Sequence, residues 1–120
     1  MTIEDMQNIC LKLPGTTQDI KWEDHLCFNV GGKIYLITSP DQVPVTASFK
    51  ASEEDFTSLT EREGISPARY LARYKWAQVD DINRLSEYEW KKFLVRSYQL
   101  VFKKLPARLR KEIASNENSK

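Results

Sequence analysis

A change to two-residue periodicity at His25 restricts the fold of this chain more than any other feature. Residues 25–30 alternate between apolar and less apolar side chains, and residues 33–38 form a second run rich in β-branched and aromatic types. Gly31 and Gly32, between the two runs, can adopt the positive φ angles that a two-residue hairpin turn requires. The pattern therefore predicts a β-hairpin.

The two-residue turn also predicts a register for this hairpin. With a regular ladder, Phe28 lies opposite Tyr35 on one face of the sheet, and Cys27 lies opposite Leu36 on the other. Because both faces then carry apolar side chains, we expect the second face to be partly covered as well.

A long amphipathic stretch near the C-terminus predicts a helix. Ser86 and Glu89 have the spacing of a capping box. Apolar residues then recur at i, i+3, i+4 and i+7, while Lys, Arg and Gln occupy the opposite face. The inward-facing set is Trp90, Phe93, Leu94, Ser97, Tyr98, Val101, Phe102 and Leu105. We expect this helix to close the core and to be disrupted at Pro106.

The other segments predict shorter elements. Thr2 with Asp5 forms another capping box, and Ser52 precedes an acidic first helical turn. In chain order we expect a helix to residue 13, a polar loop at 16–21, the hairpin, a strand at 43–50, a helix from 52 to 63, a short helix at 67–74 and a strand at 75–79. Helices and antiparallel strands in this mixture predict the α+β class.

The chain of 120 residues fits one domain, which we expect to span residues 1–113, with a polar, disordered tail at 114–120. No apolar run approaches the roughly 20 residues that span a bilayer. The N-terminal segment carries acids where a signal peptide carries bases, and Cys10 and Cys27 are too few for a disulfide framework. These features favour a cytoplasmic location, and we expect a monomer.

Charge is distributed unevenly along the chain, although the net charge is only +1. Residues 1–61 carry four basic and ten acidic side chains, and residues 62–120 carry fourteen basic and seven acidic ones. Such asymmetry is one indication of a nucleic-acid or membrane-surface partner. The alternative interpretation is that the two halves attract each other and pack together.

Catalytic and metal-binding patterns are weak. His25 is the only histidine, and it lies with Asp24 and Cys27 in a run that offers too few converging ligands for a metal. His25 and Cys27 are separated by about 6–7 Å along a strand, too far for a nucleophile–base pair. Gly31-Gly32-Lys33 looks like part of a phosphate loop but lies inside a hairpin. We therefore expect no enzyme activity, no metal and no cofactor.

Basic and aromatic residues suggest binding. Lysine and arginine side chains contact phosphates, and exposed aromatic rings stack on bases. The candidate nucleic-acid-binding residues are Lys33, Lys50, Arg69, Arg73, Lys75, Trp22 and Trp76. The competing interpretation is that both tryptophans belong to the core at the edges of the sheet.

Several short motifs, taken in order, resemble the MmcQ/YjbR family of small bacterial proteins. They are Leu13-Pro14-Gly15, Trp22, the stretch FNVGGKIY at 28–35, Ser48-Phe49-Lys50, Trp76, Ser97-Tyr98 and Leu105-Pro106. The resemblance covers about residues 3–110. It implies a CyaY-like (frataxin-like) two-layer sandwich with helices packed on one face of an antiparallel sheet. It also implies a role in DNA binding, by analogy with a double-wing arrangement.

Carried over by position, the family motif places Trp22, Lys33, Lys50 and Trp76 on the candidate surface, whereas Ser97 and Tyr98 fall on the buried helical face. Iron chemistry is not implied, because the first helix here offers only the acidic residues Glu4 and Asp5. The leading hypothesis is a non-enzymatic DNA-binding protein. The alternative is a protein-interaction or small-ligand module that uses a sheet face left open by the helices.

Overall fold

The computed structural model describes residues 1–118, and residues 119–120 lie outside the described part. The helices are α1 (Ile3–Cys10), α2 (Glu53–Thr60), α3 (Glu87–Phe102) and α4 (Ala107–Asn118), with short 3-10 helices η1 (Ala72–Tyr74) and η2 (Ile82–Arg84). The strands are β1 (Thr16–Lys21), β2 (His25–Val30), β3 (Lys33–Ser39), β4 (Thr46–Lys50), β5 (Ile65–Pro67) and β6 (Trp76–Val79). They form one antiparallel sheet in the order β1-β2-β3-β4-β6-β5.

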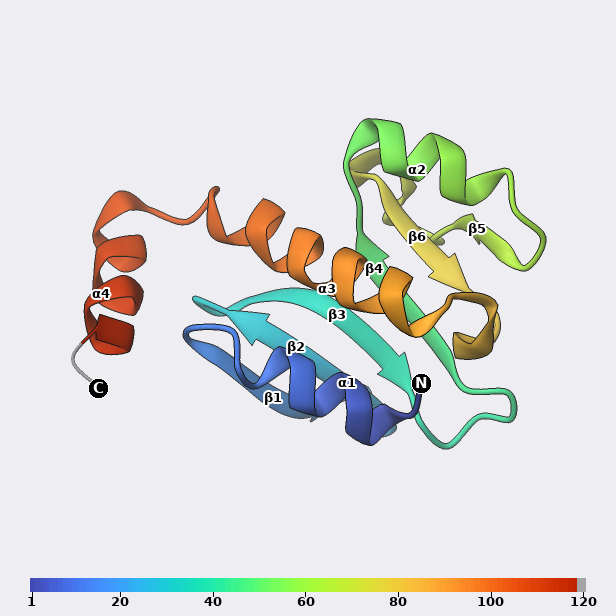
Figure 1. Ribbon diagram of the computed structural model, residues 1–120, viewed down its shortest axis with the longest axis horizontal. Coiled ribbons are helices and arrows are strands. Elements are labelled where there is room, and N and C mark those ends of the chain that lie inside the picture. Colours follow the sequence, from blue (N-terminus) through green and yellow to red (C-terminus); the bar gives the residue numbers. More distant parts are fainter. Residues whose placement is uncertain (119–120) are drawn as a thin grey trace.

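Helices α1, α2 and α3 form the second layer of the molecule (Figure 1). Helix α3 contacts β2, β3 and β4, α2 contacts β5 and β6, and α1 packs beside α3. The core between the layers is one cluster, in which the ring of Phe49 meets Trp90 edge-on at 5.5 Å and stacks on Phe93 at 5.7 Å. The expected α+β sandwich is therefore confirmed.

The helix start signals are also confirmed. Thr2 and Ser86 form capping boxes with Asp5 and Glu89, and the Ser52 hydroxyl accepts a hydrogen bond from the Asp55 N–H. The expected face of α3 is buried from Trp90 to Val101. Local hydrogen bonds and a 3.6-residue period were enough to predict these helix starts and the buried face of α3, because each depends only on residues within one or two turns.

The predicted hairpin exists, but its predicted register is wrong beyond the first pairs. Asn29 lies opposite Ile34, as expected, whereas Phe28 lies opposite Leu36 and not Tyr35. The ladder shifts between Phe28 and Asn29, which leaves Tyr35 as an extra residue on β3. A bulge of this kind places two neighbouring side chains on one face. Tyr35 can therefore reach α3, where its ring meets Tyr98 edge-on at 5.5 Å.

Two segments were assigned wrongly from sequence. Residues 16–21 form the edge strand β1 and not a loop, because an edge strand needs no apolar alternation when most of its side chains are in water. Ile65–Pro67 form the other edge strand, β5, instead of opening a helix. Pro67 is tolerated there because an edge strand has one side without ladder hydrogen bonds.

Helix α4 extends from the end of α3 and lies at the tip of the β2–β3 hairpin (Figure 1). Gly31 lies so close to it that a Cβ atom there would meet the Leu105 side chain at 2.6 Å and the Leu109 side chain at 3.0 Å. Ile113 approaches Gly15 in the same way. The helix continues to Asn118 and so covers most of the expected polar tail, whose last two residues lie outside the described part.

Candidate functional site

A cleft of about 560 Å³ opens where the C-terminal end of α3 meets the hairpin end of the sheet. It is lined by Lys33, Ile34, Lys50, Leu71, Tyr74, Trp76, Val101, Lys104, Leu105 and Pro106. The lining comes from β3, β4, β6, the segment 71–74, the end of α3 and the turn between α3 and α4, which are far apart in sequence. Its size lies within the range of about 300–1,000 Å³ typical of small-ligand sites. We refer to it as the corner cleft.

Lys50 is the most firmly held cation of the corner cleft. Its backbone N–H donates to the Ser97 hydroxyl at 3.0 Å, and that hydroxyl donates to the Tyr35 carbonyl at 2.6 Å. Its ammonium donates to the Tyr74 carbonyl at 3.0 Å. The buried Ser97, expected to be structural, thus connects α3 to the end of β4. This connection fixes the backbone from which the Lys50 side chain extends.

The corner cleft gathers positive charge. The pKa of Lys50 lies below its usual range because the side chain is partly buried and because Lys104 and Lys103 add positive charge nearby. Among the ion pairs within the described residues, none involves Lys33, Lys50 or Lys104. No acidic residue is among the described residues that line the cleft. An anion entering it would therefore relieve repulsion among these cations.

The floor of the corner cleft is apolar. Trp76 pairs with Lys50 in the β4–β6 ladder and is only 7% exposed, as in the competing interpretation that places it in the core. Leu71, Val101 and Leu105 line the same cleft. The site therefore combines lysine ammonium groups with an aromatic and aliphatic surface, which suits an anion that carries a flat apolar part.

The loop beside the cleft, residues 68–74, repeats the sequence Ala-Arg-Tyr. The Arg69 guanidinium lies 5.1 Å from the centroid of the Tyr70 ring, and that of Arg73 lies 5.0 Å from the Tyr74 ring. Tyr70 is 83% exposed and Tyr74 is 50% exposed. The loop thus presents two aromatic rings, each with a cation beside it, next to the corner cleft.

The structure brings only part of the predicted set together. Lys33, Lys50 and Trp76 line the corner cleft, and Arg69 and Arg73 lie on the adjoining loop. These five residues come from strands or loops that meet at one corner of the sheet.

The other two predicted residues lie elsewhere. Lys75 has a left-handed backbone, and its ammonium lies 5.3 Å from the Phe56 ring of α2. Trp22 lies in the β1–β2 turn, at the opposite end of β2 from Gly31, with its ring edge-on to His25 at 5.9 Å. It is 63% exposed, so the competing interpretation, which placed it in the core, was wrong.

Sequence reasoning missed Lys104 and Tyr74, although each carried a signal. Lys103-Lys104 stands directly before Leu105, a residue assigned to the buried face, so one of these lysines had to lie near the core's edge. The repeated Ala-Arg-Tyr at 68–74 places an arginine directly before each tyrosine. Neither signal shows which other segments lie nearby, because that depends on tertiary packing.

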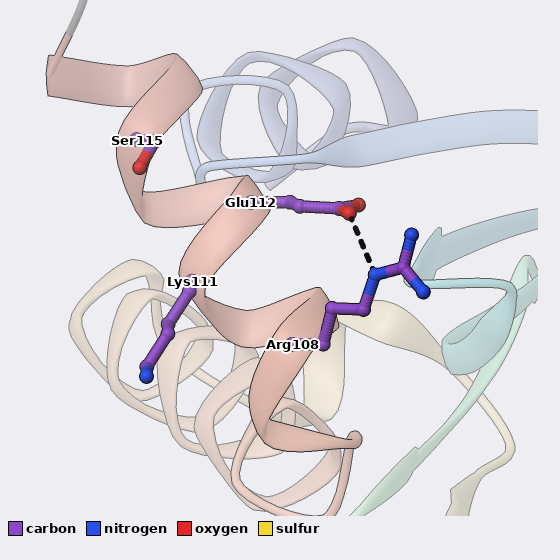
Figure 2. Close-up of a pocket in the computed structure, with 4 residues that line it drawn as sticks. All are labelled: Arg108, Lys111, Glu112 and Ser115. Atoms are coloured by element: carbon purple, nitrogen blue, oxygen red, sulfur yellow. Dashed lines mark ion pairs between the residues drawn. The ribbon is translucent and has the colours of Figure 1, made fainter.

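A second hollow, of about 660 Å³, lies on the outer surface of α4 (Figure 2). Arg108, Lys111, Glu112 and Ser115 line it, and all four come from this one helix. The Arg108 guanidinium pairs with the Glu112 carboxylate at 3.4 Å. With no second element to enclose it, this surface offers less to a ligand than the corner cleft does.

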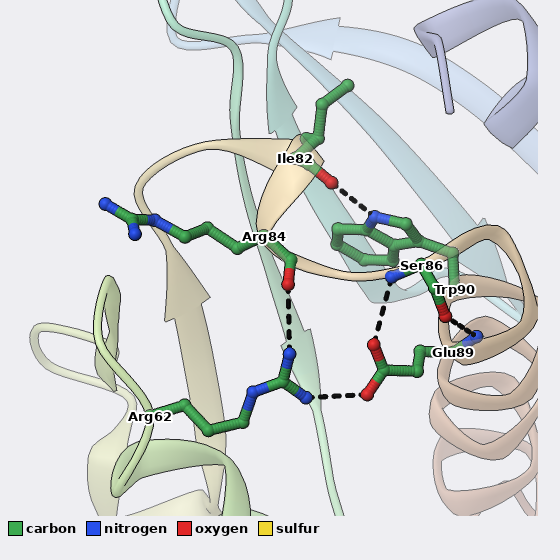
Figure 3. A network of polar contacts seen from close by, with 6 residues as sticks. All are labelled: Arg62, Ile82, Arg84, Ser86, Glu89 and Trp90. Atoms are coloured by element: carbon green, nitrogen blue, oxygen red, sulfur yellow. Dashed lines mark hydrogen bonds and ion pairs between the residues drawn. The ribbon is translucent and has the colours of Figure 1, made fainter.

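The opposite end of α3 holds a closed polar network (Figure 3). The Arg62 guanidinium donates to the Glu89 carboxylate at 2.6 Å and to the Arg84 carbonyl at 3.0 Å. The Trp90 indole N–H donates to the Ile82 carbonyl at 2.7 Å. The hydrogen bonds from Arg62 and from the Ser86 backbone hold the pKa of Glu89 below its usual range. The donors and acceptors of this network hydrogen-bond to one another, so we interpret it as stabilising the fold and not as binding a ligand.

The segment around His25 shows no metal centre. The His25 ring nitrogen Nδ1 lies 2.8 Å from the Asp24 carboxylate, and the buried Cys27 thiol lies 3.8 Å from the His25 carbonyl. Burial raises the pKa of Cys27 to about 11. Within the described residues, no three His, Cys, Asp or Glu side chains gather as a metal would require. In the same part of the chain, no helix has the length and apolar character to cross a bilayer.

Comparison with known proteins identifies relatives. The YjbR family model matches residues 11–100. The crystal structure of Deinococcus radiodurans protein DR2400, with the domain DUF419, is similar at a TM-score of 0.84 and 27% identity, over 94% of this chain and 88% of that one. A Pseudomonas syringae protein shares the fold at a TM-score of 0.68 and 23% identity, over 84% and 99% of the two chains. No curated protein matches significantly.

Proposed function

This chain belongs to the MmcQ/YjbR family, and from that premise we propose that it is a non-enzymatic DNA-binding protein whose contact centre is the corner cleft. One observation carries the proposal. Lys33, Lys50 and Lys104 line a single cleft, and none of the other lining residues that the structure describes is acidic. Convergent cations without carboxylates raise the free energy of the free protein and bind a phosphate backbone favourably.

The adjoining surface supports the same proposal. Arg69 and Arg73 extend the positive charge along the loop beside the cleft. Lys103, at the end of α3, adds further positive charge near Lys50. Arg108 and Lys111 are exposed on α4, which follows Lys103 in the chain. A phosphate backbone makes several contacts along its length, so a chain of cations is more favourable than one isolated site.

Titration of a fluorescein-labelled 16-base-pair duplex at 50 mM and 200 mM salt tests the proposal. Binding at low salt that weakens at least tenfold at high salt is expected, because phosphate contacts release condensed counterions. The variant with Lys33, Lys50 and Lys104 all changed to Gln is expected to lose most of this binding.

A matched control changes Lys12, Lys21 and Lys91 to Gln, which alters the net charge equally but away from the corner cleft. If the two triple variants bind equally, the cleft is not the contact centre. If the unmodified chain binds neither this duplex nor a single strand at 50 mM salt, DNA binding itself is rejected.

The alternative function, a module that binds a partner on the open sheet face, has less support. One row of side chains across that face is Asp19, Cys27, Ile37, Ser48, Gln78 and Ser66, which are neighbours in the ladders. Ile37 is the only large aliphatic side chain among them. A face of this composition offers little apolar area to a partner, in contrast to the corner cleft.

A further inference from the structure

The corner cleft has features that a double-stranded ligand cannot use. We propose that it takes an unpaired nucleotide, so that single-stranded nucleic acid binds more tightly than duplex. This inference rests on the proposed DNA binding and specifies the ligand of the same site. It follows from the exposed tyrosines, the shape of the cleft and the position of Lys50.

The first argument concerns Tyr70 and Tyr74. Tyr70 is 83% exposed and Tyr74 is 50% exposed, and each lies beside an arginine of the same loop. In a duplex the faces of the bases are covered by their neighbours, so such rings can contact only sugar and phosphate. In a single strand the bases are free to stack on them, and such stacking strengthens binding. The two rings are therefore matched to unpaired bases.

The second argument concerns shape. The cleft of about 560 Å³ is concave, and Leu71, Trp76 and Leu105 contribute to its apolar floor. A duplex presents a convex, charged backbone, which would contact the lysines but would not reach the exposed part of this floor. An extruded base with its sugar can enter and cover the floor while its phosphate stays near the lysines. The lysines can bind the phosphates of either ligand, whereas the apolar floor can contact only an unpaired nucleotide.

The third argument concerns the position of Lys50 relative to Tyr74. The Lys50 ammonium lies 3.0 Å from the Tyr74 carbonyl and 5.9 Å from the centroid of the Tyr74 ring. A cation and an aromatic face are therefore held together by a main-chain contact. One nucleotide carries both complementary groups, a phosphate for the ammonium and a base for the ring. Lys33 and Lys104 line the same cleft, where the phosphates of neighbouring nucleotides can reach them.

Three labelled oligonucleotides of equal length test the inference. They are a 12-nucleotide oligothymidylate, the same backbone with abasic sites throughout, and a 12-base-pair duplex. At 50 mM salt, oligothymidylate is expected to bind about tenfold more tightly than either of the others, as base stacking contributes about 1.4 kcal/mol or more. Equal affinity for oligothymidylate and the abasic strand would overturn the inference, because both carry the same phosphates.

Substitution of Tyr74 separates stacking from general apolar contact. Tyr74→Leu is expected to reduce oligothymidylate affinity about tenfold and to leave the abasic strand and the duplex within twofold. Tyr88→Leu is the control, since Tyr88 is 75% exposed near the start of α3, away from the cleft. A similar loss of oligothymidylate affinity in both variants would contradict a specific role of Tyr74.

The outcomes distinguish this inference from the function on which it rests. If the duplex binds in a salt-dependent manner but oligothymidylate binds no better, DNA binding holds and the single-strand inference fails. If no oligonucleotide binds at 50 mM salt, both fail. Circular dichroism and urea unfolding of each variant confirm that lost binding does not reflect lost folding.

Discussion

The two ends of helix α3 use charge in opposite ways. At the N-terminal end, Glu89 accepts from Arg62 and from the Ser86 backbone, and the neighbouring Trp90 is anchored to Ile82 (Figure 3). At the C-terminal end, Lys33, Lys50 and Lys104 line one cleft, to which no carboxylate of the described part of the chain contributes. One end is therefore neutralised from within the protein, whereas the lysines of the other end have no ion pair among the described residues.

This difference has a thermodynamic consequence. Paired groups stabilise the fold, and removing one partner leaves the other unsatisfied. Like charges that converge without a partner raise the free energy of the folded state, which is acceptable where a ligand compensates for it. We call the N-terminal end of α3, with Arg62 and Glu89, the paired end, and its C-terminal end, with Lys33, Lys50 and Lys104, the lysine end. Substitutions at the paired end should therefore lower the stability of the fold, whereas substitutions at the lysine end should lower DNA binding.

The largest expected effect is at the paired end. Trp90 is completely buried, donates to the Ile82 carbonyl and contacts the Phe49 ring. Trp90→Ala should lower the free energy of unfolding by about 3–5 kcal/mol, from lost contacts, a cavity and an unpaired carbonyl. Urea denaturation measures it, with Tyr88→Ala as a control on the same helix. A loss below about 1 kcal/mol would show that this end is not a rigid anchor.

The next effect sharpens the contrast at the lysine end. Lys50→Met removes a charge that burial and neighbouring lysines already disfavour. DNA affinity at 50 mM salt should fall about tenfold, the equivalent of one charge-assisted hydrogen bond. The free energy of unfolding should stay within about 0.5 kcal/mol of the original, because the Lys50 ammonium makes a hydrogen bond at the surface but carries an unfavourable charge. Anisotropy and urea unfolding give the two values. A large loss of stability with unchanged binding would reverse the comparison.

A smaller effect depends on pH. The hydrogen bond from Arg62, and then that from the Ser86 backbone, lower the pKa of Glu89 in the folded protein. The unfolded chain therefore takes up a proton first on acidification, so this stabilisation is present above the unfolded pKa of about 4.3 and is lost as pH falls through the folded value.

Glu89→Gln removes that dependence. The original chain should lose about 0.5–1 kcal/mol more stability than this variant between pH 6 and pH 3, as for other partly exposed ion pairs. Urea denaturation at a series of pH values measures the difference. Identical pH profiles would mean that the Arg62–Glu89 contact does not stabilise the fold.

The smallest expected effect is a gain. Lys104 is exposed, and it adds to the positive charge around Lys50. Lys104→Gln should raise the free energy of unfolding by a few tenths of a kcal/mol at low salt and by nothing measurable at 0.5 M salt, where charges are screened. Thermal unfolding at the two salt concentrations measures it. A decrease at low salt would indicate that Lys104 has a stabilising partner.

The fold was largely predictable because most of its signals are local. The Ser86–Glu89 capping box and the apolar face that follows it predicted α3, and the glycine pair predicted the β2–β3 turn. Prediction failed where the outcome depends on neighbours. The polar segment 16–21 becomes a strand because β2 provides hydrogen-bond partners, and Pro67 is accommodated because β5 is at an edge.

The candidate site was predictable only in part. Residue type alone suggested Lys33, Lys50 and Trp76, and the structure brings these three to one cleft. Residue type gave no means of separating them from Trp22, which lies at the other end of β2. Lys104 and Tyr74 were missed, because their place beside Lys50 results from contacts over 24 or more positions of sequence.

By itself, the sequence determined the class of fold, the starts of the capped helices and the family, since these depend on short-range periodicity, capping and motif order. Only the tertiary structure decided the register of the β2–β3 hairpin and brought Lys33, Lys50 and Lys104 to one cleft. The extra residue Tyr35 packs against Tyr98 of α3, and Ser97 of the same helix binds both Tyr35 and Lys50. A bulge that is stabilised by a helix some 60 residues later leaves no local pattern, because the free energy that favours it comes from packing between distant segments.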